Sequence, residues 1–155
     1  MPIEVGQKAP NFTLFDTEKN KVTLSEQKDN NVLLLFFPLA FTSVCTKELC
    51  SIRDNIAVYN NVNAKVFGIS VDTVFTLGKF KEEQHLNFPL LSDFNKEVAA
   101  AYGTLYETFV LEMKGVSKRS AFIVGKDGLI KYAEVLESAG DLPNFAAIQA
   151  VLQSL

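Results

Sequence analysis

The chain has 155 residues, enough for one ordinary domain that buries about two-thirds of the surface its unfolded form exposes. Hydrophobic residues make up 48% and charged residues 21% of the sequence, which excludes a disordered chain. With 15 basic against 18 acidic residues the formal net charge is −3, so nucleic acid is not an expected partner.

Neither a membrane span nor an export signal is expected. The segment Met1–Val5 lacks the basic stretch followed by an apolar one that marks a secretory signal. The longest apolar run, Val32–Phe41, has ten residues, whereas a membrane span needs about 20. We therefore expect a cytoplasmic protein, in a thiol-reducing compartment where two cysteines indicate a catalytic, redox-active or metal-binding role before a structural disulfide.

The first predicted elements are a hairpin and a buried strand. Phe12–Phe15 and Val22–Leu24 flank a polar stretch, which is typical of a small N-terminal hairpin. Val32–Phe37 is apolar without alternation, which indicates a strand covered on both faces. Pro38 ends that strand, because proline has no N–H to donate to a central ladder.

A strand–helix–strand unit follows from this point. A helix is predicted from Thr42 or Ser43 to about Asn60, because apolar residues recur there at spacings of three, four and three. These residues are Leu49, Ile52, Ile56 and Tyr59. Ala64–Val71 reads as a second buried strand, which makes the three elements a right-handed βαβ unit.

The rest of the chain continues the alternation of helices and strands. The expected elements are a helix over Val74–His85, a strand over Pro89–Leu91, a helix over Lys96–Tyr102 stopped by Gly103, strands over Ser120–Val124 and Leu129–Val135 joined by a turn at Gly125–Gly128, and a helix over Phe145–Leu152. This order predicts a single α/β domain over residues 1–155, with a central mixed sheet flanked by helices.

Cys45 is placed where a reactive cysteine would be expected. If Thr42 is the N-cap, its side chain accepts from an N–H of the first turn, and Cys45 occupies the third helical position. The positive end of the helix dipole favours a thiolate there, and the thiolate is the nucleophilic form. The alternative for Cys45 alone is inert packing, since free cysteines are often buried.

Cys50 lies five residues further along the same predicted helix. That spacing separates the two residues by about 7.5 Å of rise and about 140° of rotation. A disulfide needs Cα atoms within about 7 Å and converging side chains, so an intact helix cannot join Cys45 to Cys50. Either the two never bond within one chain, or bonding unwinds the helix; otherwise Cys50 is a core thiol beside Leu49 and Ile56.

Metal and cofactor chemistry find little support. Zinc needs four ligands, and His85 is the chain's only histidine beside two cysteines. The turn at Gly125–Gly128 is too short for a phosphate-binding loop. We expect no metal and no cofactor.

The segment around the first cysteine carries a recognisable pattern. Pro38-x-x-x-Thr42-x-x-Cys45, with Glu48 three residues on, resembles the active-site motif of the peroxiredoxins of the AhpC/TSA family. Two further segments are similar to family segments: Lys118–Val124, which resembles the strand whose arginine faces the thiol, and the opening Gly6–Leu14. The resemblance covers nearly the whole chain, and it implies a thioredoxin-like fold.

The resemblance also implies a role for each matched residue. Cys45 would attack the peroxide as a thiolate and become a sulfenic acid. Arg119 would favour that thiolate and donate to the peroxide oxygens. Thr42 would orient the peroxide, Pro38 would shape the loop and limit water, and Glu48 would hold Arg119. Each residue also has a purely structural alternative. Arg119 could be a surface arginine and Thr42 a helix cap. Pro38 could only end the strand, and Glu48 could be a solvated carboxylate.

Two branches of the family match different parts of the motif. Cys50 resembles the residue that resolves the oxidised cysteine in the bacterioferritin comigratory, or Q-type, branch. The sequence Pro38–Thr42 looks more like the one-cysteine E-type alkyl hydroperoxide reductases. The first branch implies a Cys45–Cys50 disulfide recycled by thioredoxin or a similar dithiol protein, and the second implies an external thiol.

Two other function classes remain as alternatives. A thioredoxin-like disulfide oxidoreductase is disfavoured, because such proteins use Cys-x-x-Cys and four residues separate these thiols. A non-catalytic domain on the same fold is the other. Either a monomer or a homodimer is expected, and Leu39, Phe41 and Phe109 could form an interface or a substrate wall.

Overall fold

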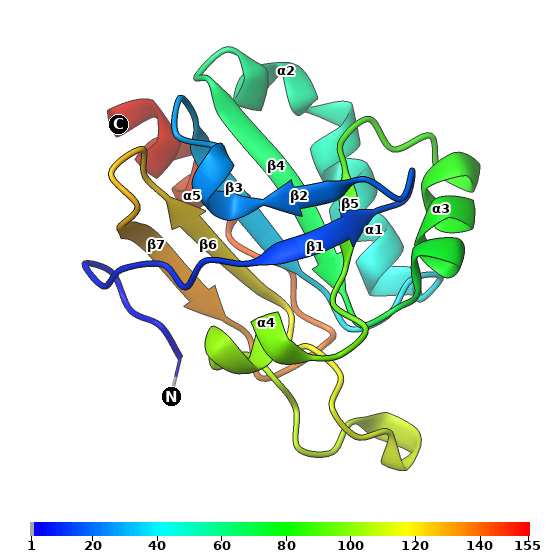
Figure 1. The fold of residues 1–155 in the computed structure, drawn as a ribbon. Coiled ribbons are helices and arrows are strands. Elements are labelled where there is room, and N and C mark those ends of the chain that lie inside the picture. The colour runs from blue at the N-terminus through cyan, green and yellow to red at the C-terminus, as the bar shows by residue number, and fades with distance from the viewer. Residues whose placement is uncertain (1) are drawn as a thin grey trace.

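The computed structural model describes residues 2–155 as a seven-stranded mixed sheet with helices on both faces (Figure 1). The strands are β1 (Thr13–Asp16), β2 (Lys21–Thr23), β3 (Asn31–Phe36), β4 (Ala64–Ser70), β5 (Leu90–Ser92), β6 (Ser120–Val124) and β7 (Ile130–Val135). The helices are α1 (Ser43–Asp54), α2 (Ile56–Asn60), α3 (Val74–Glu83), α4 (Glu97–Ala101) and α5 (Phe145–Ser154), with 3₁₀ turns at Leu24–Glu26 and Val110–Glu112.

The sheet has the order β2-β1-β5-β4-β3-β6-β7. β3, β4 and β5 run parallel, and β1 and β6 join them antiparallel. The N-terminal hairpin of β1 and β2 therefore extends the sheet at one edge, and the hairpin of β6 and β7 forms the other. The predicted mixed α/β sheet and both hairpins are confirmed.

The central strand β3 is buried on both faces, as its unbroken apolar run predicted. Leu33 and Leu35 point to one hydrophobic cluster, and Leu34 and Phe36 point to the other. The first cluster is closed by α1, α2, α3 and α5, and the second by α4 together with the N-terminal segment. Figure 1 shows α4 on the side of the sheet away from α1.

The prediction of a single helix to Asn60 is wrong, because the helix breaks at Asn55. That residue has φ −118° and ψ 19°, and its side-chain amide donates to the Ser51 carbonyl at 2.9 Å. Asparagine favours such local bonds over helical ones, so α1 ends and α2 begins after it. The apolar stripe survives the break, since Ile52, Ile56 and Tyr59 all pack in the first cluster.

Left-handed residues set several other element ends. Gly103, with φ 67°, follows α4 and stops it as predicted. α3 ends at Glu83, two residues before the predicted end at His85, and His85 itself is left-handed with φ 52°. The turn before β7 has Gly128 at φ 81°, and β7 begins at Ile130, one residue after the predicted start at Leu129.

Candidate active site

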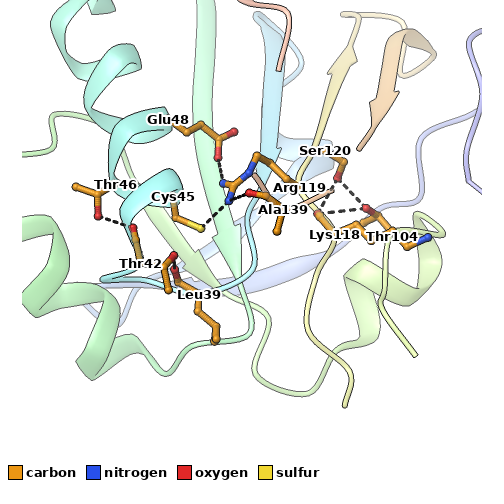
Figure 2. A network of polar contacts seen from close by, with 10 residues as sticks. All are labelled: Leu39, Thr42, Cys45, Thr46, Glu48, Thr104, Lys118, Arg119, Ser120 and Ala139. Carbon is orange, nitrogen blue, oxygen red and sulfur yellow. Dashed lines mark hydrogen bonds and ion pairs between the residues drawn. The ribbon is translucent and has the colours of Figure 1, made fainter. Parts of the chain in front are cut away.

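The candidate site lies where α1 begins, beside the end of β3 and the start of β6 (Figure 2). Cys45 is in the first turn of α1, at the third helical position, as the sequence predicted. Its side chain is fully buried in the first hydrophobic cluster. A helix N-terminus at this place directs backbone N–H groups and a positive partial charge toward the cysteine.

Thr42 occupies the N-cap position by its backbone, but its side chain does not cap the helix. The loop folds back so that the Thr42 hydroxyl donates to the Leu39 carbonyl at 2.8 Å. The expected cap bond is therefore wrong, because the hydroxyl satisfies the loop in place of the helix. Instead, Thr46 donates both its N–H and its hydroxyl to the Thr42 carbonyl, at 2.9 and 2.8 Å.

Arg119 reaches Cys45 from the start of β6, although 74 residues separate them in sequence. Its Nη2 lies 3.2 Å from the Cys45 Sγ and also donates to the Ala139 carbonyl at 3.0 Å. Its Nη1 donates to Glu48 Oε1 at 2.8 Å (Figure 2). The planar guanidinium is thus fixed by three partners from two segments, α1 and the loop that contains Ala139, and one of its N–H groups points to the sulfur.

Glu48 and Arg119 form an ion pair that is almost completely buried. Burial raises the pKa of Glu48 from 4.5 to about 7, and the attraction of Arg119 offsets this only in part. The attraction of Glu48 and Cys45 raises the pKa of Arg119 above its ordinary value, against the effect of burial. Arg119 therefore remains a permanent cation that two acidic groups share.

This buried pair has incomplete hydrogen bonding. Within residues 2–155, Glu48 Oε2 and Arg119 Nε have no hydrogen-bond partner. A buried ion pair with unpaired atoms stabilises a fold poorly, because the loss of hydration exceeds the attraction unless every group is satisfied. The arrangement therefore holds a cation beside the thiol and is a poor source of stability for the domain.

The loop between β3 and α1 holds the remaining motif residues. Pro38 is buried two residues after the end of β3. Phe41 is about half exposed, and its ring packs edge-on against Phe80 of α3 at 5.1 Å. Its φ of 68° lies in the left-handed region, which a bulky side chain adopts only when its surroundings enforce it.

Cys50 lies apart from this site, further along α1. It is partly buried against the first cluster, and its Sγ is 3.5 Å from Gln84 Oε1. Both cysteines are free thiols, and α1 is continuous between them. The structure thus brings Cys45, Glu48 and Arg119 together and leaves Cys50 outside the cluster.

Two contacts at the site involve groups that the sequence interpretation did not include. The Ala139 carbonyl receives Arg119, and a backbone carbonyl has no sequence signature. The Asp72 carboxylate accepts the Ala40 N–H at 2.8 Å. Asp72 follows the carboxyl end of parallel strand β4, where functional groups of α/β sheets gather. This position in the sequence could have identified Asp72 as a candidate.

Within the part of the chain that the structure describes, no three histidine, cysteine or acidic side chains lie close enough to hold a metal ion. No helix among residues 2–155 is long and apolar enough to cross a membrane.

Comparison with known proteins agrees with this geometry. The sequence profile of the AhpC/TSA family matches residues 5–133. A Mycobacterium tuberculosis protein whose name places it among the peroxiredoxins is 40% identical over 131 residues, 83% of this chain and 83% of its own length. Alkyl hydroperoxide reductase E of the same organism is 38% identical over 136 residues, 86% of each chain. The crystal structure of peroxidoxin BcpB from Mycobacterium tuberculosis has 30% identity and a TM-score of 0.87, covering 99% of this chain and 98% of that one.

Proposed function

The chain belongs to the AhpC/TSA family and is a thiol peroxidase with a thioredoxin-like fold, and on this premise we propose that Cys45 is the residue that attacks the peroxide. The Cys45 thiolate attacks the terminal oxygen of a hydroperoxide and breaks the O–O bond. Sulfur is oxidised to a sulfenic acid, and the other oxygen leaves as an alkoxide or hydroxide that takes a proton to become alcohol or water.

The single observation that carries this assignment is the 3.2 Å contact between Arg119 Nη2 and Cys45 Sγ. A fixed cation beside a thiol at a helix N-terminus favours the thiolate, which is the attacking form. Negative charge moves from sulfur to the leaving oxygen during the attack. A guanidinium that already touches the sulfur is placed to follow that charge, and its contact with Glu48 keeps it in position.

Thr42 and Pro38 complete the proposed site. The Thr42 hydroxyl donates its hydrogen to Leu39, so its oxygen lone pairs are left to accept the hydrogen of an incoming hydroperoxide. Pro38 is buried and offers no N–H to water, which keeps the base of the loop apolar. The substrates that we propose for this site are hydrogen peroxide and organic hydroperoxides.

We assign the second half of the cycle to Cys50. Its thiol attacks the sulfenic acid of Cys45, a disulfide forms and water leaves. Because α1 is continuous between the two residues, the turn between them must unwind first. Thioredoxin or a similar dithiol protein then reduces the exposed disulfide, and the thiol-reducing cytosol is the compartment that we propose.

One mass measurement tests these assignments. After one equivalent of peroxide and a non-reducing digest, we expect the protein to lose two hydrogens and to contain a Cys45–Cys50 crosslink. Cys50→Ser should instead gain one oxygen on Cys45, and Cys45→Ser should not react. A wild-type protein that gains one oxygen with Cys50 still free would refute the resolving role. Peroxide oxidation that leaves Cys45 unchanged would refute the attacking role.

A further inference from the structure

A small hydrogen-bonded network joins the carboxyl ends of β4 and β5 to the loop that follows β3. Asp72 Oδ2 accepts the Ala40 N–H at 2.8 Å and the Ser70 hydroxyl at 2.6 Å. The Ser92 hydroxyl donates to the Asp72 carbonyl at 2.6 Å. Ser70 of β4 therefore fixes the Asp72 carboxylate and Ser92 of β5 fixes the Asp72 backbone, while the carboxylate also binds the active-site loop.

Ala40 is adjacent to the strained residue of that loop. Phe41 is left-handed with φ 68°, a conformation that its side chain disfavours. Besides the bond of Thr42 to Leu39 within the loop, two contacts with other elements hold it there: the Asp72–Ala40 bond and the packing of Phe41 on Phe80. A strained residue persists only where its surroundings enforce it, so losing one of these contacts releases the loop.

The start of α1 depends on the same loop. No side chain of the described residues caps the helix at Thr42, whose hydroxyl is bound to Leu39 within the loop. The position of the first turn, and of Cys45 within it, is therefore set by the path from Ala40 to Thr42. The Asp72 carboxylate contacts that path at the Ala40 N–H.

We propose that Asp72 is a positioning residue of the peroxidase. Its carboxylate holds the Pro38–Thr42 loop in the conformation in which Cys45 faces Arg119, and its bond to Ala40 must break before α1 unwinds toward Cys50. The inference rests on the proposed roles of the two cysteines. Asp72 thus favours the reaction with peroxide and delays the formation of the disulfide.

Asp72→Ala tests both consequences at once. The rate constant for oxidation of Cys45 by peroxide, measured in a single turnover, should fall about tenfold, because the reactive loop is less populated. The fraction of Cys45 lost to sulfinic acid at high peroxide should fall several-fold, because the released turn lets Cys50 reach the sulfenic acid sooner. Asp72→Asn, which retains an acceptor oxygen, should lie between wild type and Asp72→Ala in both measurements.

Asp16→Ala is a matched control. Asp16 is also partly buried and its carboxylate also accepts two hydrogen bonds, here from the N–H groups of Glu18 and Asn20, but it lies in the N-terminal hairpin. The Asp16→Ala variant should lower the melting temperature without changing the rate of Cys45 oxidation or the fraction of sulfinic acid. If Asp72→Ala does not fold, Ser70→Ala removes one of the donors that fix the carboxylate and should act in the same direction.

Unchanged oxidation of Cys45 in a folded Asp72→Ala variant overturns the proposal, and so does slower oxidation together with more sulfinic acid. Failure of the resolving role is distinguishable from both results. In that case wild type forms no crosslink, yet the single-turnover rate of Cys45 in Asp72→Ala still decides whether Asp72 positions the loop.

Discussion

The two faces of the central sheet differ in what they bury. The face toward α1 buries the Cys45 thiol and lies against the Glu48–Arg119 ion pair, which has unpaired polar atoms. The face toward α4 buries a layer of aromatic rings, in which Tyr102 packs on Phe36 and Phe122 at 5.5 and 5.3 Å between ring centres. Both faces are built from alternate residues of the same strands.

The polar groups on the two faces are satisfied to different degrees. On the aromatic face, the Tyr102 hydroxyl donates to the Pro10 carbonyl at 2.8 Å, and Asp93 accepts the N–H groups of Val98 and Ala99 at the start of α4. On the catalytic face, charge is buried without full pairing. The satisfied polar groups of the aromatic face stabilise the fold. The buried ion pair of the catalytic face keeps an electrostatic field beside Cys45 at a cost in stability.

This difference assigns separate tasks to the two faces. The proposed cycle unwinds a turn of α1, so the platform beneath it has to remain folded while that helix changes. Interlocked aromatic rings supply such a platform, because they bury large areas and fit each other at defined angles. Mutations on the aromatic face should therefore change mainly the free energy of unfolding, and mutations of the catalytic residues should change mainly the rate of reaction with peroxide.

The largest effect is expected from Phe122→Ala on the aromatic face. Phe122 is fully buried and packs edge-on against Phe36 and Tyr102. Truncation should lower the free energy of unfolding by about 3–5 kcal/mol in urea titrations. At a temperature where the variant is folded, Cys45 should still react with peroxide within about twofold of wild type. A peroxide rate that falls together with stability would contradict the separation of the two faces.

Arg119→Lys should have the opposite signature. A lysine ammonium cannot hold Cys45, Glu48 and the Ala139 carbonyl at once, because it lacks the planar fork of the guanidinium. The rate of Cys45 oxidation should fall between about 100- and 1,000-fold, the range for losing one fixed donor to developing charge. Arg53→Lys changes the chain's only other arginine and should leave that rate unaltered. Equal losses in both variants would contradict a specific role for Arg119.

Much of the fold could be predicted because it follows from short-range patterns. The unbroken apolar run of β3 indicated burial on both faces, and Gly103 marked the end of α4. The segment 103–118 could not be predicted, since distant pairs such as the bridge between Leu105 and Ser117 hold it. Its 3₁₀ turn also has Leu111 at φ 58°, a conformation that leucine rarely adopts.

The candidate site divides in the same way. The motif around Cys45 could be recognised in the sequence, because its residue types and spacing are specific, and the arginine before β6 followed from the family resemblance that this motif carries. The hydrogen bond of Thr42 to Leu39 could not, because the path of the loop decides whether a hydroxyl caps a helix. The Ala139 carbonyl likewise reaches Arg119 only through tertiary structure.

A smaller effect, confined to the catalytic face, is expected from Glu48→Gln. Burial raises the pKa of Glu48 from 4.5 to about 7, so the folded chain holds this proton more tightly than the unfolded chain does. Glu48 therefore stabilises the fold fully below about pH 4.5, and this contribution is lost as the pH rises through about 7. Glutamine keeps an acceptor for Arg119 but does not titrate.

The difference in unfolding free energy between Glu48→Gln and wild type should consequently change with pH. From about pH 4.5 to about pH 8 it should shift by up to about 3 kcal/mol in favour of the glutamine variant. Urea titrations at several pH values measure this, and Glu83→Gln, at an exposed position on α3, should give a curve parallel to wild type. If Glu48→Gln also runs parallel to wild type, an incompletely paired carboxyl that titrates is not what distinguishes the catalytic face from the aromatic one, where the buried Asp93 accepts two N–H groups.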